Sequence, residues 1–222
     1  MTNIDKALDY VADGMAVGLG SGRAAERFIR ALAAGRRHVR CVATSAASAG
    51  LATGLGLSVV TLDDVSHLDL TVDGADEVDP QLNLIKGYGR ALVREKIVAA
   101  ASRRMIVIAD ASKRVDRIGK AKLPVEILPF AQGFVTARLE ALGARIALRT
   151  GYQTDQGNII ADCIFPEMPD PSALATHLSA IPGVLGHGLF LDEVDCAYIG
   201  DGDRVIRLES RQPPAAPGVR HP

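Results

Sequence analysis

Four acidic residues that follow an apolar run carry the strongest chemical signal in the chain. The run 68–72 leads into Asp73, Asp76, Glu77 and Asp79, four acids within seven residues. In parallel α/β sheets, ligands bind at the carboxyl ends of the strands. We therefore expect these carboxylates at a binding edge, with an acidic surface turn or a carboxylate metal site as the alternatives.

A lysine and a glutamate come shortly after the acids. Lys86 begins the loop Gly87-Tyr88-Gly89, and Glu95 lies in a predicted helix over 90–101. The helical neighbours of Glu95 are apolar, and burial against them would raise the pKa of its carboxylate and suit it to general-base work. Lys96 has equally apolar neighbours, so a solvated helix face is the alternative. The combination of acids, lysine and glutamate in one segment favours chemistry.

A glycine-rich turn, Gly18-Leu19-Gly20-Ser21-Gly22-Arg23, lies between a predicted strand and a predicted helix. Free backbone N–H groups and the helix dipole favour an anion there, and phosphate is the obvious candidate. The spacing is GxGxG, and no acid that could hold a ribose hydroxyl occurs between Glu26 and Asp63. The turn therefore favours a simple phosphate over a dinucleotide. Tight turn geometry alone, or a nucleotide-dependent oxidoreductase, are the alternatives.

Apolar periodicity predicts strands that alternate with helices through the first half of the chain. Strands are expected at 15–19, 39–43, 57–61, 68–72 and 105–109, and helices at 5–12, 24–34, 45–55 and 90–101. This alternation is typical of a Rossmann-like, doubly wound and mostly parallel sheet in an α/β protein.

The pattern changes after residue 113. Strands are expected at 123–129, 145–149, 158–164, 194–199 and 204–208, and helices at 131–142 and 171–178. We predict a Rossmann-like catalytic domain over 1–121 and 195–210 and a smaller α+β domain over 122–194. The proline-rich tail, 211–222, is expected to be disordered.

Composition argues for small-molecule chemistry. The chain has 25 Lys and Arg against 26 Asp and Glu, no Trp and 4% aromatic residues, which disfavours nucleic-acid and membrane-surface partners. Cys41, Cys163 and Cys196 show no disulfide or zinc-ligand spacing. No apolar stretch approaches the ~18 residues of a membrane span, and the acidic N-terminal segment lacks the signal-peptide pattern. A cytoplasmic location is expected.

The segment from Asp73 to Ile97 closely resembles the central motif of type A ribose-5-phosphate isomerases. The segments 109–113, 123–126 and 181–184 resemble further blocks of that family, in the same order. The resemblance implies interconversion of D-ribose 5-phosphate and D-ribulose 5-phosphate through a cis-enediolate. It also implies no metal or organic cofactor, a small phosphorylated sugar as the partner, and a homodimer or homotetramer.

The resemblance assigns roles by position. It implies that Glu95 is the base that moves a proton between C2 and C1, and that Lys86 stabilises the enediolate oxygen. Asp73 and Asp76 would hold sugar hydroxyls and assist ring opening. The implied substrate-binding positions are Ser21, Gly22, Gly74, Ala75, Gly87, Gly89 and Lys113.

Three loops depart from the family pattern, and one of them, at Thr44-Ser45, is less polar than usual because it contains Ala46, Ala47 and Ala49. The phosphate-side loop usually reads Gly-Thr-Gly-Ser-Thr, whereas Arg23 and Ala24 here replace two hydroxyl residues. The loop after the lysine is usually all glycine, and Tyr88 interrupts it, where a large side chain could narrow the pocket. These departures fall on substrate anchoring, so we expect an active isomerase with altered affinity or substrate range. A non-catalytic sugar-phosphate sensor on the same fold is the alternative.

Overall fold

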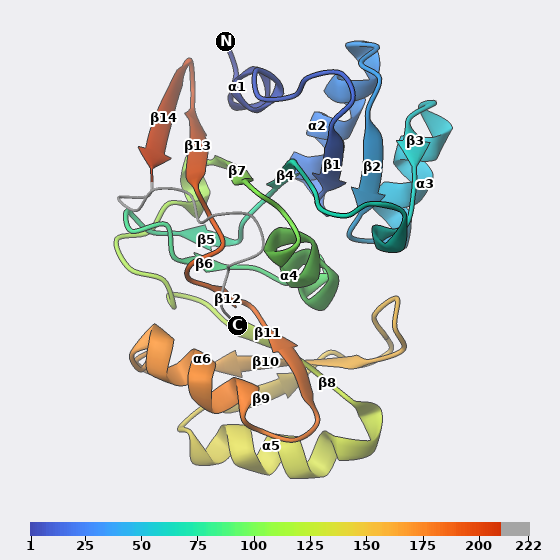
Figure 1. The fold of residues 1–222 in the computed structure, drawn as a ribbon. Coiled ribbons are helices and arrows are strands. Elements are labelled where there is room, and N and C mark those ends of the chain that lie inside the picture. Colours follow the sequence, from blue (N-terminus) through green and yellow to red (C-terminus); the bar gives the residue numbers. More distant parts are fainter. Residues whose placement is uncertain (210–222) are drawn as a thin grey trace.

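The larger lobe of the protein is built on a seven-stranded sheet. The computed structural model describes residues 1–209, so the predicted tail over 211–222 lies outside the described residues. The strand order is β14-β13-β7-β4-β1-β2-β3, and every neighbouring pair except β13 and β14 is parallel (Figure 1). The strands are β1 (Ala16–Leu19), β2 (Arg40–Ala43), β3 (Ser58–Val59), β4 (Leu70–Asp73), β7 (Met105–Asp110), β13 (Cys196–Asp201) and β14 (Arg204–Glu209). The predicted mostly parallel sheet is confirmed.

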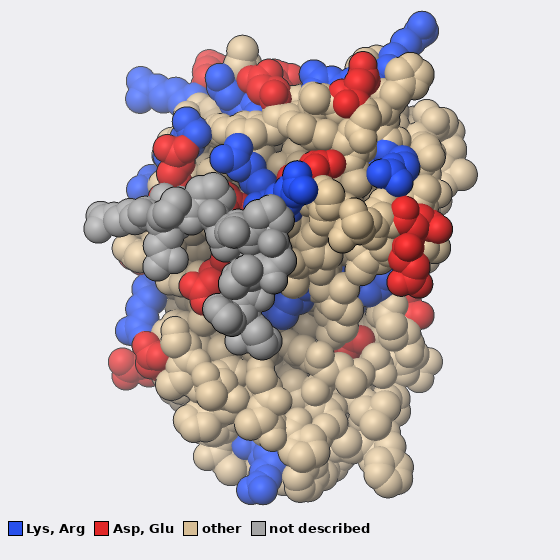
Figure 2. Space-filling view, in the orientation of Figure 1, with Lys and Arg blue, Asp and Glu red and all other residues tan. Residues whose placement is uncertain are grey.

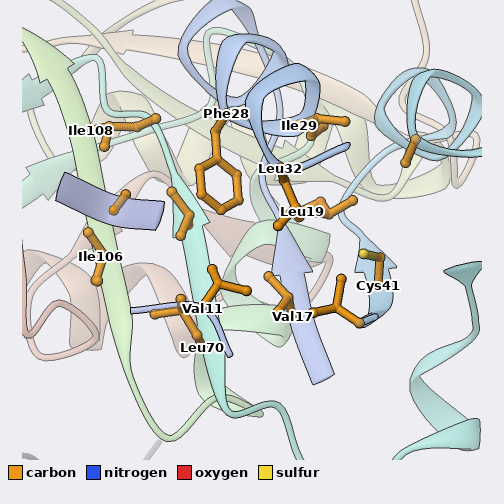
Figure 3. Packing of buried hydrophobic residues seen from close by; sticks show 14 of the residues in the cluster. Val11, Val17, Leu19, Phe28, Ile29, Leu32, Cys41, Leu70, Ile106 and Ile108 are labelled. Carbon is orange, nitrogen blue, oxygen red and sulfur yellow. The ribbon is translucent and has the colours of Figure 1, made fainter. Parts of the chain in front are cut away.

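Both faces of this sheet are covered. Side chains of β7 alternate between two apolar clusters: Ile106 and Ile108 enter one, and Met105 and Val107 enter the other. The first cluster includes residues of α1 (Asn3–Leu8), α2 (Arg23–Ala34) and α3 (Ala46–Gly54), and in Figure 3 Phe28 reaches from α2 down onto the strands. Ala99 of α4 (Leu92–Ala100) enters the second. Helices on both faces make the sheet doubly wound.

The smaller lobe is an antiparallel sheet with two helices. Its strand order is β11-β8-β10-β9, and its core is a third apolar cluster that includes Val125, Ile127 and Leu139. The elements are β8 (Leu123–Ile127), α5 (Gln132–Ala141), β9 (Arg145–Leu148), β10 (Ile159–Ile164), α6 (Pro171–Ser179) and β11 (Val184–His187). In Figure 1 this lobe lies beneath α4. The exact division of the chain into domains stays a prediction.

A third, three-stranded sheet joins the lobes. It consists of β5 (Glu77–Val78), β6 (Leu84–Ile85) and β12 (Leu189–Phe190), all antiparallel. Residues 1–209 also contain three short 3-10 helices: η1 (Leu62–Asp64), η2 (Ala111–Lys113) and η3 (Pro129–Ala131). The sequence pattern does not predict β5, β6, β11 or β12, although Lys86 directly follows β6.

Two helices start where the sequence pattern did not predict. The helix predicted over 5–12 spans Asn3–Leu8, because Thr2 and Asp5 exchange side-chain-to-backbone hydrogen bonds in a capping box. The helix predicted from residue 90 begins at Leu92, because Arg90 has a left-handed φ of 73°. Within residues 1–209, no helix has the length and apolar character to cross a membrane.

Candidate active site

Asp73 is the last residue of β4 and lies against the glycine turn. Its Oδ1 accepts hydrogen bonds from the N–H groups of Ser21 at 3.1 Å and Gly74 at 2.7 Å. A Cβ on Gly20 would lie 2.0 Å from that oxygen, so only glycine lets the turn approach Asp73 this closely. The carboxylate is thereby fixed at the carboxyl end of the sheet, 1% exposed.

Lys86 is the centre of a buried ionic cluster. Its Nζ lies 2.9 Å from Asp73 Oδ2 and 3.3 Å from Glu95 Oε2, and it donates to Gly74 O at 2.7 Å. The residue is 3% exposed. Burial alone would lower the pKa of Lys86, but the carboxylates of Asp73 and Glu95 outweigh it and raise that pKa. The ammonium group is therefore charged.

Glu95 faces this ammonium from the first turn of α4. The predicted burial is present, since Glu95 is 3% exposed. Burial raises the pKa of Glu95 to about 8; the charge of Lys86 opposes the rise and that of Asp73 adds to it. A carboxylate with a pKa near neutrality is a stronger base than a solvated glutamate, so Glu95 is suited to take a proton from carbon.

Asp76 lies at the edge of the cluster. Its Oδ2 accepts a hydrogen bond from Tyr88 N–H at 2.9 Å. Burial raises the pKa of Asp76, against that hydrogen bond and the charges of Lys86 and Lys113. Asp76 is thus linked through the Tyr88 peptide to the loop that follows Lys86.

The two other acids of the motif are structural. Glu77 accepts hydrogen bonds from the N–H groups of Gly119, Lys120 and Ala121. Asp79 accepts from the N–H groups of Gln81 and Asn83 and so holds a turn. The acidic cluster seen in the sequence therefore separates into two site carboxylates and two that fix loops.

The predicted phosphate end is rich in hydroxyl groups. Ser21 Oγ lies 2.8 Å from both Thr44 Oγ1 and Ser45 Oγ. Helix α2 begins after Gly22, which has a φ of 86° and provides no side-chain cap, so the N–H groups of its first turn remain available to an anion. A Cβ on Gly74 would lie 3.4 Å from Ala24 Cβ, which places residues 73–75 beside this turn.

Two of the residues that depart from the family pattern, Arg23 and Tyr88, differ in their surroundings. Arg23 is exposed at the start of α2, as is Gly89 in the loop after Lys86. Tyr88 packs its ring against the apolar cluster of the smaller lobe, and its hydroxyl donates to Lys122 O at 3.3 Å. The side chain of Tyr88 is thus directed into the smaller lobe.

Sequence reasoning missed an aromatic ring beside the cluster. Phe190 is fully buried, and its centroid lies 5.5 Å from Lys86 Nζ and 3.9 Å from Lys96 Nζ. Lys96 itself forms an ion pair with Glu193 at 2.6 Å. Phe190 belongs to the two-residue strand β12, which has no periodicity to reveal it; a phenylalanine in a chain with 4% aromatic residues was the one available signal.

A second ionic cluster, built around the buried Asp162, is not marked by the sequence either. Asp162 in β10 lies 2.7 Å from both Lys122 Nζ and Arg149 Nη2. Burial would raise the pKa of Asp162, but hydrogen bonds from Arg149 and Lys122 outweigh it and lower that pKa. Arg149 also donates to Gly87 O at 2.9 Å, which connects this cluster to the loop after Lys86.

The arrangement around Lys86 fits a proton shift between neighbouring carbons. Glu95 can accept the proton, and the adjacent ammonium can stabilise the negative charge that develops on oxygen. The hydroxyl-rich turn at the start of α2 offers an anchor for a phosphate. Among residues 1–209, no group of three His, Cys, Asp or Glu side chains is arranged to hold a metal ion.

Comparison of the sequence with known proteins identifies close relatives. The family model described as ribose 5-phosphate isomerase A (phosphoriboisomerase A) matches residues 40–204. Ribose-5-phosphate isomerase A of Sphingopyxis alaskensis is 49% identical over 207 residues, covering 90% of this chain and 91% of the relative. That of Roseiflexus castenholzii is 48% identical and covers 92% of each.

Solved structures show the same similarity. Ribose 5-phosphate isomerase A from Neisseria gonorrhoeae matches with a TM-score of 0.91 and 36% identity over 95% of each chain. A D-ribose-5-phosphate isomerase in complex with phospho-erythronic acid matches with a TM-score of 0.90 and 37% identity, over 93% of this chain and 96% of that one. The similarity covers both lobes.

Proposed function

The chain belongs to the ribose 5-phosphate isomerase A family, so its reaction interconverts D-ribose 5-phosphate and D-ribulose 5-phosphate, and we propose that Glu95 is the base of this reaction. The observation that supports this role best is the position of Glu95. Its carboxylate is 3% exposed and lies 3.3 Å from the Lys86 ammonium. One carboxylate on one face of the substrate can take the proton from C2 and return it to C1.

Lys86 balances the charge during this transfer. When Glu95 takes the proton it becomes neutral, and the negative charge moves to the enediolate oxygen. The Lys86 ammonium already lies beside Glu95, so it is close enough to stabilise the negative charge on the enediolate oxygen. This interaction is strong because water is excluded from the site. Interactions that strengthen as the charge moves lower the barrier more than they strengthen binding of the substrate.

The remaining predicted residues bind the ends of the sugar phosphate. Asp73 and Asp76 hold hydroxyl groups and assist ring opening. The N–H groups at the start of α2, the hydroxyl of Ser21 and the ammonium of Lys113 hold the phosphate. The structural relative that contains phospho-erythronic acid, a phosphorylated sugar acid, supports a site of this chemistry.

The variant Glu95→Gln tests the proposed base. It keeps the size and hydrogen bonding of the side chain, so substrate binding should remain measurable. Turnover and the exchange of the C2 proton with solvent should both fall by about 10⁴-fold, the upper range for loss of a general base. Near-normal turnover in this variant would remove Glu95 from the mechanism. No observation favours the sensor alternative.

We also propose that the protein forms a homodimer or homotetramer through its smaller lobe. Four large apolar side chains are exposed around η3, α5 and β11: Leu128, Phe130, Phe134 and Leu185. Phe130 is 97% exposed and Phe134 is 50% exposed. In Figure 2 most charged side chains lie over the larger lobe, and the visible face of the smaller lobe is largely uncharged. A second copy of this chain would cover such a surface.

Light scattering after size-exclusion chromatography tests this interface. Phe130→Asp should lower the molecular mass to that of a smaller assembly. Leu55→Asp, at an exposed leucine that follows α3 in the larger lobe, is the matched control and should leave the mass unchanged. An unchanged mass for Phe130→Asp would contradict the proposal.

A cytoplasmic location is proposed on the chemistry of the cysteines. Cys41, Cys163 and Cys196 are all free and buried. Burial raises the pKa of all three thiols, to about 11 for Cys41 and Cys196 and about 12 for Cys163. Reduced thiols are typical of a reducing compartment. Cell fractionation would test the location.

A further inference from the structure

The carbonyl oxygen of Gly87 is held by an arginine of the smaller lobe. Arg149 follows β9 directly, and its Nη1 donates to Gly87 O at 2.9 Å. The same guanidinium donates from Nε and Nη2 to the two oxygens of Asp162, at 3.0 and 2.7 Å. A planar guanidinium that is paired with a carboxylate through two parallel bonds has a fixed orientation. Nη1 is therefore directed at Gly87.

The bond to Gly87 reaches Asp76 through a single peptide unit. The carbonyl of Gly87 and the N–H of Tyr88 belong to the same planar group and point in opposite directions. Arg149 binds the carbonyl end of this group, and Asp76 Oδ2 accepts from its N–H end at 2.9 Å. A rotation of the peptide plane would therefore break both hydrogen bonds together.

The rest of the contact fixes the same loop. The Tyr88 hydroxyl accepts from Lys122 N–H at 3.2 Å, and Lys122 Nζ lies 2.7 Å from Asp162 Oδ2. On the other side of Gly87, Lys86 N–H donates to Gly188 O at 2.9 Å. The loop that contains Lys86 is thus tied on both sides of the peptide that Arg149 holds.

The hairpin that presents Arg149 is itself anchored. The buried carboxylate of Glu126 accepts hydrogen bonds from Thr154 Oγ1 and Asn158 Nδ2, both at 2.9 Å. At the tip of the hairpin, Asp155 Oδ2 accepts from Ala46 N–H at the start of α3, at 2.7 Å. Arg149 therefore lies on a fixed support that contacts both lobes.

We propose that Arg149 is a positioning residue of the isomerase reaction, which orients the Gly87–Tyr88 peptide and through it the carboxylate of Asp76. Asp162 fixes the orientation of the Arg149 guanidinium through two hydrogen bonds. The inference rests on the roles proposed above for Asp76 and Lys86. Arg149 contacts neither the substrate nor the reacting atoms in this account; it acts only through the loop.

The variant Arg149→Lys separates positioning from charge. Lysine keeps a positive charge beside Asp162, but its ammonium has no planar fork that can bind Asp162 and Gly87 at once. Misplacement of a catalytic group by 1 Å can cost about a hundredfold in rate. We expect kcat to fall at least tenfold, with KM within threefold of the parent and a melting temperature close to it.

The titration of Asp76 gives a readout that a purely structural role would not change. The Tyr88 N–H and the charges of Lys86 and Lys113 favour the ionised form of Asp76, whereas the charge of Asp73 opposes it. When that N–H is displaced, the ionised form loses a hydrogen bond, so the pKa of Asp76 should rise, which NMR of its ¹³C-labelled carboxyl carbon measures. Arg145→Lys, at an exposed arginine at the start of β9, is the control and should change neither kcat nor this titration.

The possible outcomes are distinct. Arg149→Lys with kcat within twofold of the parent and an unmoved Asp76 titration overturns the inference, whatever its stability. If that variant does not fold, Asp162→Asn keeps the guanidinium and loosens it, and full kcat in that folded variant overturns the inference equally. An active Lys86→Met contradicts the proposed site as well, whereas an inactive Lys86→Met beside a fully active Arg149→Lys contradicts this inference alone.

Discussion

Two ionic clusters of this protein, one around Lys86 and one around Asp162, lie on either side of the Gly87 loop and differ in their ratio of charges. Around Lys86, one ammonium faces the carboxylates of Asp73 and Glu95. Around Asp162, one carboxylate faces the cations Lys122 and Arg149. Glu95 and Asp162 are both buried, so desolvation acts on both carboxylates in the same sense, although the side chain of Lys122 is 36% exposed.

The different ratio of cations to carboxylates in the two clusters shifts the pKa values of Glu95 and Asp162 in opposite directions. The pKa of Glu95 is raised to about 8, because burial raises it by more than the single Lys86 ammonium, which Asp73 also faces, lowers it. The pKa of Asp162 is lowered, because the hydrogen bonds and charges of two cations outweigh its burial. Excess carboxylate thus gives Glu95 a pKa near neutral pH, which suits the base that we propose, and excess cation keeps Asp162 ionised as a partner that holds Arg149.

Removal of the single cation should have the largest effect. Lys86→Met leaves two buried carboxylates without a counter-ion, so we expect a loss of about 3–5 kcal/mol in the free energy of unfolding. Turnover should fall by about 10³-fold, because Lys86 is the group that we propose stabilises the oxyanion. Denaturant unfolding and a coupled isomerase assay measure the two effects.

Lys122→Met is the matched change in the cation-rich cluster. Asp162 keeps its bonds to Arg149, so the expected loss is only about 1 kcal/mol, in the range of a single hydrogen bond. Equal losses in the free energy of unfolding for Lys86→Met and Lys122→Met would contradict the proposed difference between the two clusters.

The pH dependence of stability should be the next largest effect. Because the folded pKa of Glu95 is about 8, above that of an unfolded glutamate near 4.5, the folded protein binds the extra proton between these values. This contribution is present at low pH and is lost as pH rises, by at most about 1.4 kcal/mol per pH unit. Glu95→Gln removes it, so the variant should gain stability relative to the parent from pH 5 to pH 8. A constant difference across that range would contradict the raised pKa.

The contribution of Asp162 to the pH dependence of stability should have the opposite sign. Because its folded pKa is lowered, its contribution is present above the unfolded value and is lost as pH falls toward the folded one. Asp162→Asn should cost about 2 kcal/mol at pH 7, where charged hydrogen bonds are lost. The difference from the parent should shrink below about pH 4. Chemical unfolding at pH 7 and pH 3 measures this change.

Tyr88→Phe should give the smallest effect. It removes the hydroxyl that bonds to the Lys122 backbone and keeps the ring and the N–H that Asp76 accepts. We expect a loss of about 1 kcal/mol in stability, with turnover within a few-fold of the parent. A large change in KM for ribose 5-phosphate would place the hydroxyl at the substrate.

The sequence predicted the elements that have a clear period. Strand β7 was expected at 105–109 and spans Met105–Asp110, because alternating apolar side chains fill both faces of the sheet. The strands β5, β6 and β12 have two residues each, too few for any pattern to appear. They were missed, although they position Lys86 and Phe190.

The family resemblance predicted the site residues by position, and the structure brings Asp73, Lys86 and Glu95 together in one cluster. Burial of Lys86 could not be predicted from its type, because lysine is rarely buried unless it is paired. The bond from Arg149 to Gly87 spans 62 positions in the sequence and ends on a backbone atom, so no side-chain pattern marks it. The direction of Tyr88 likewise depends on the smaller lobe against which it packs.

The opposite pKa shifts of Glu95 and Asp162 can be measured in one experiment. The carboxyl carbons of Asp and Glu would be labelled with ¹³C and followed by NMR from pH 3 to pH 9, with Glu95→Gln and Asp162→Asn to assign the two signals. The Glu95 carbon should titrate near pH 8, and the Asp162 carbon should titrate below the ordinary range of aspartate. A Glu95 signal that titrates below about pH 5, as ordinary glutamates do, would contradict the proposal that excess carboxylate prepares the base.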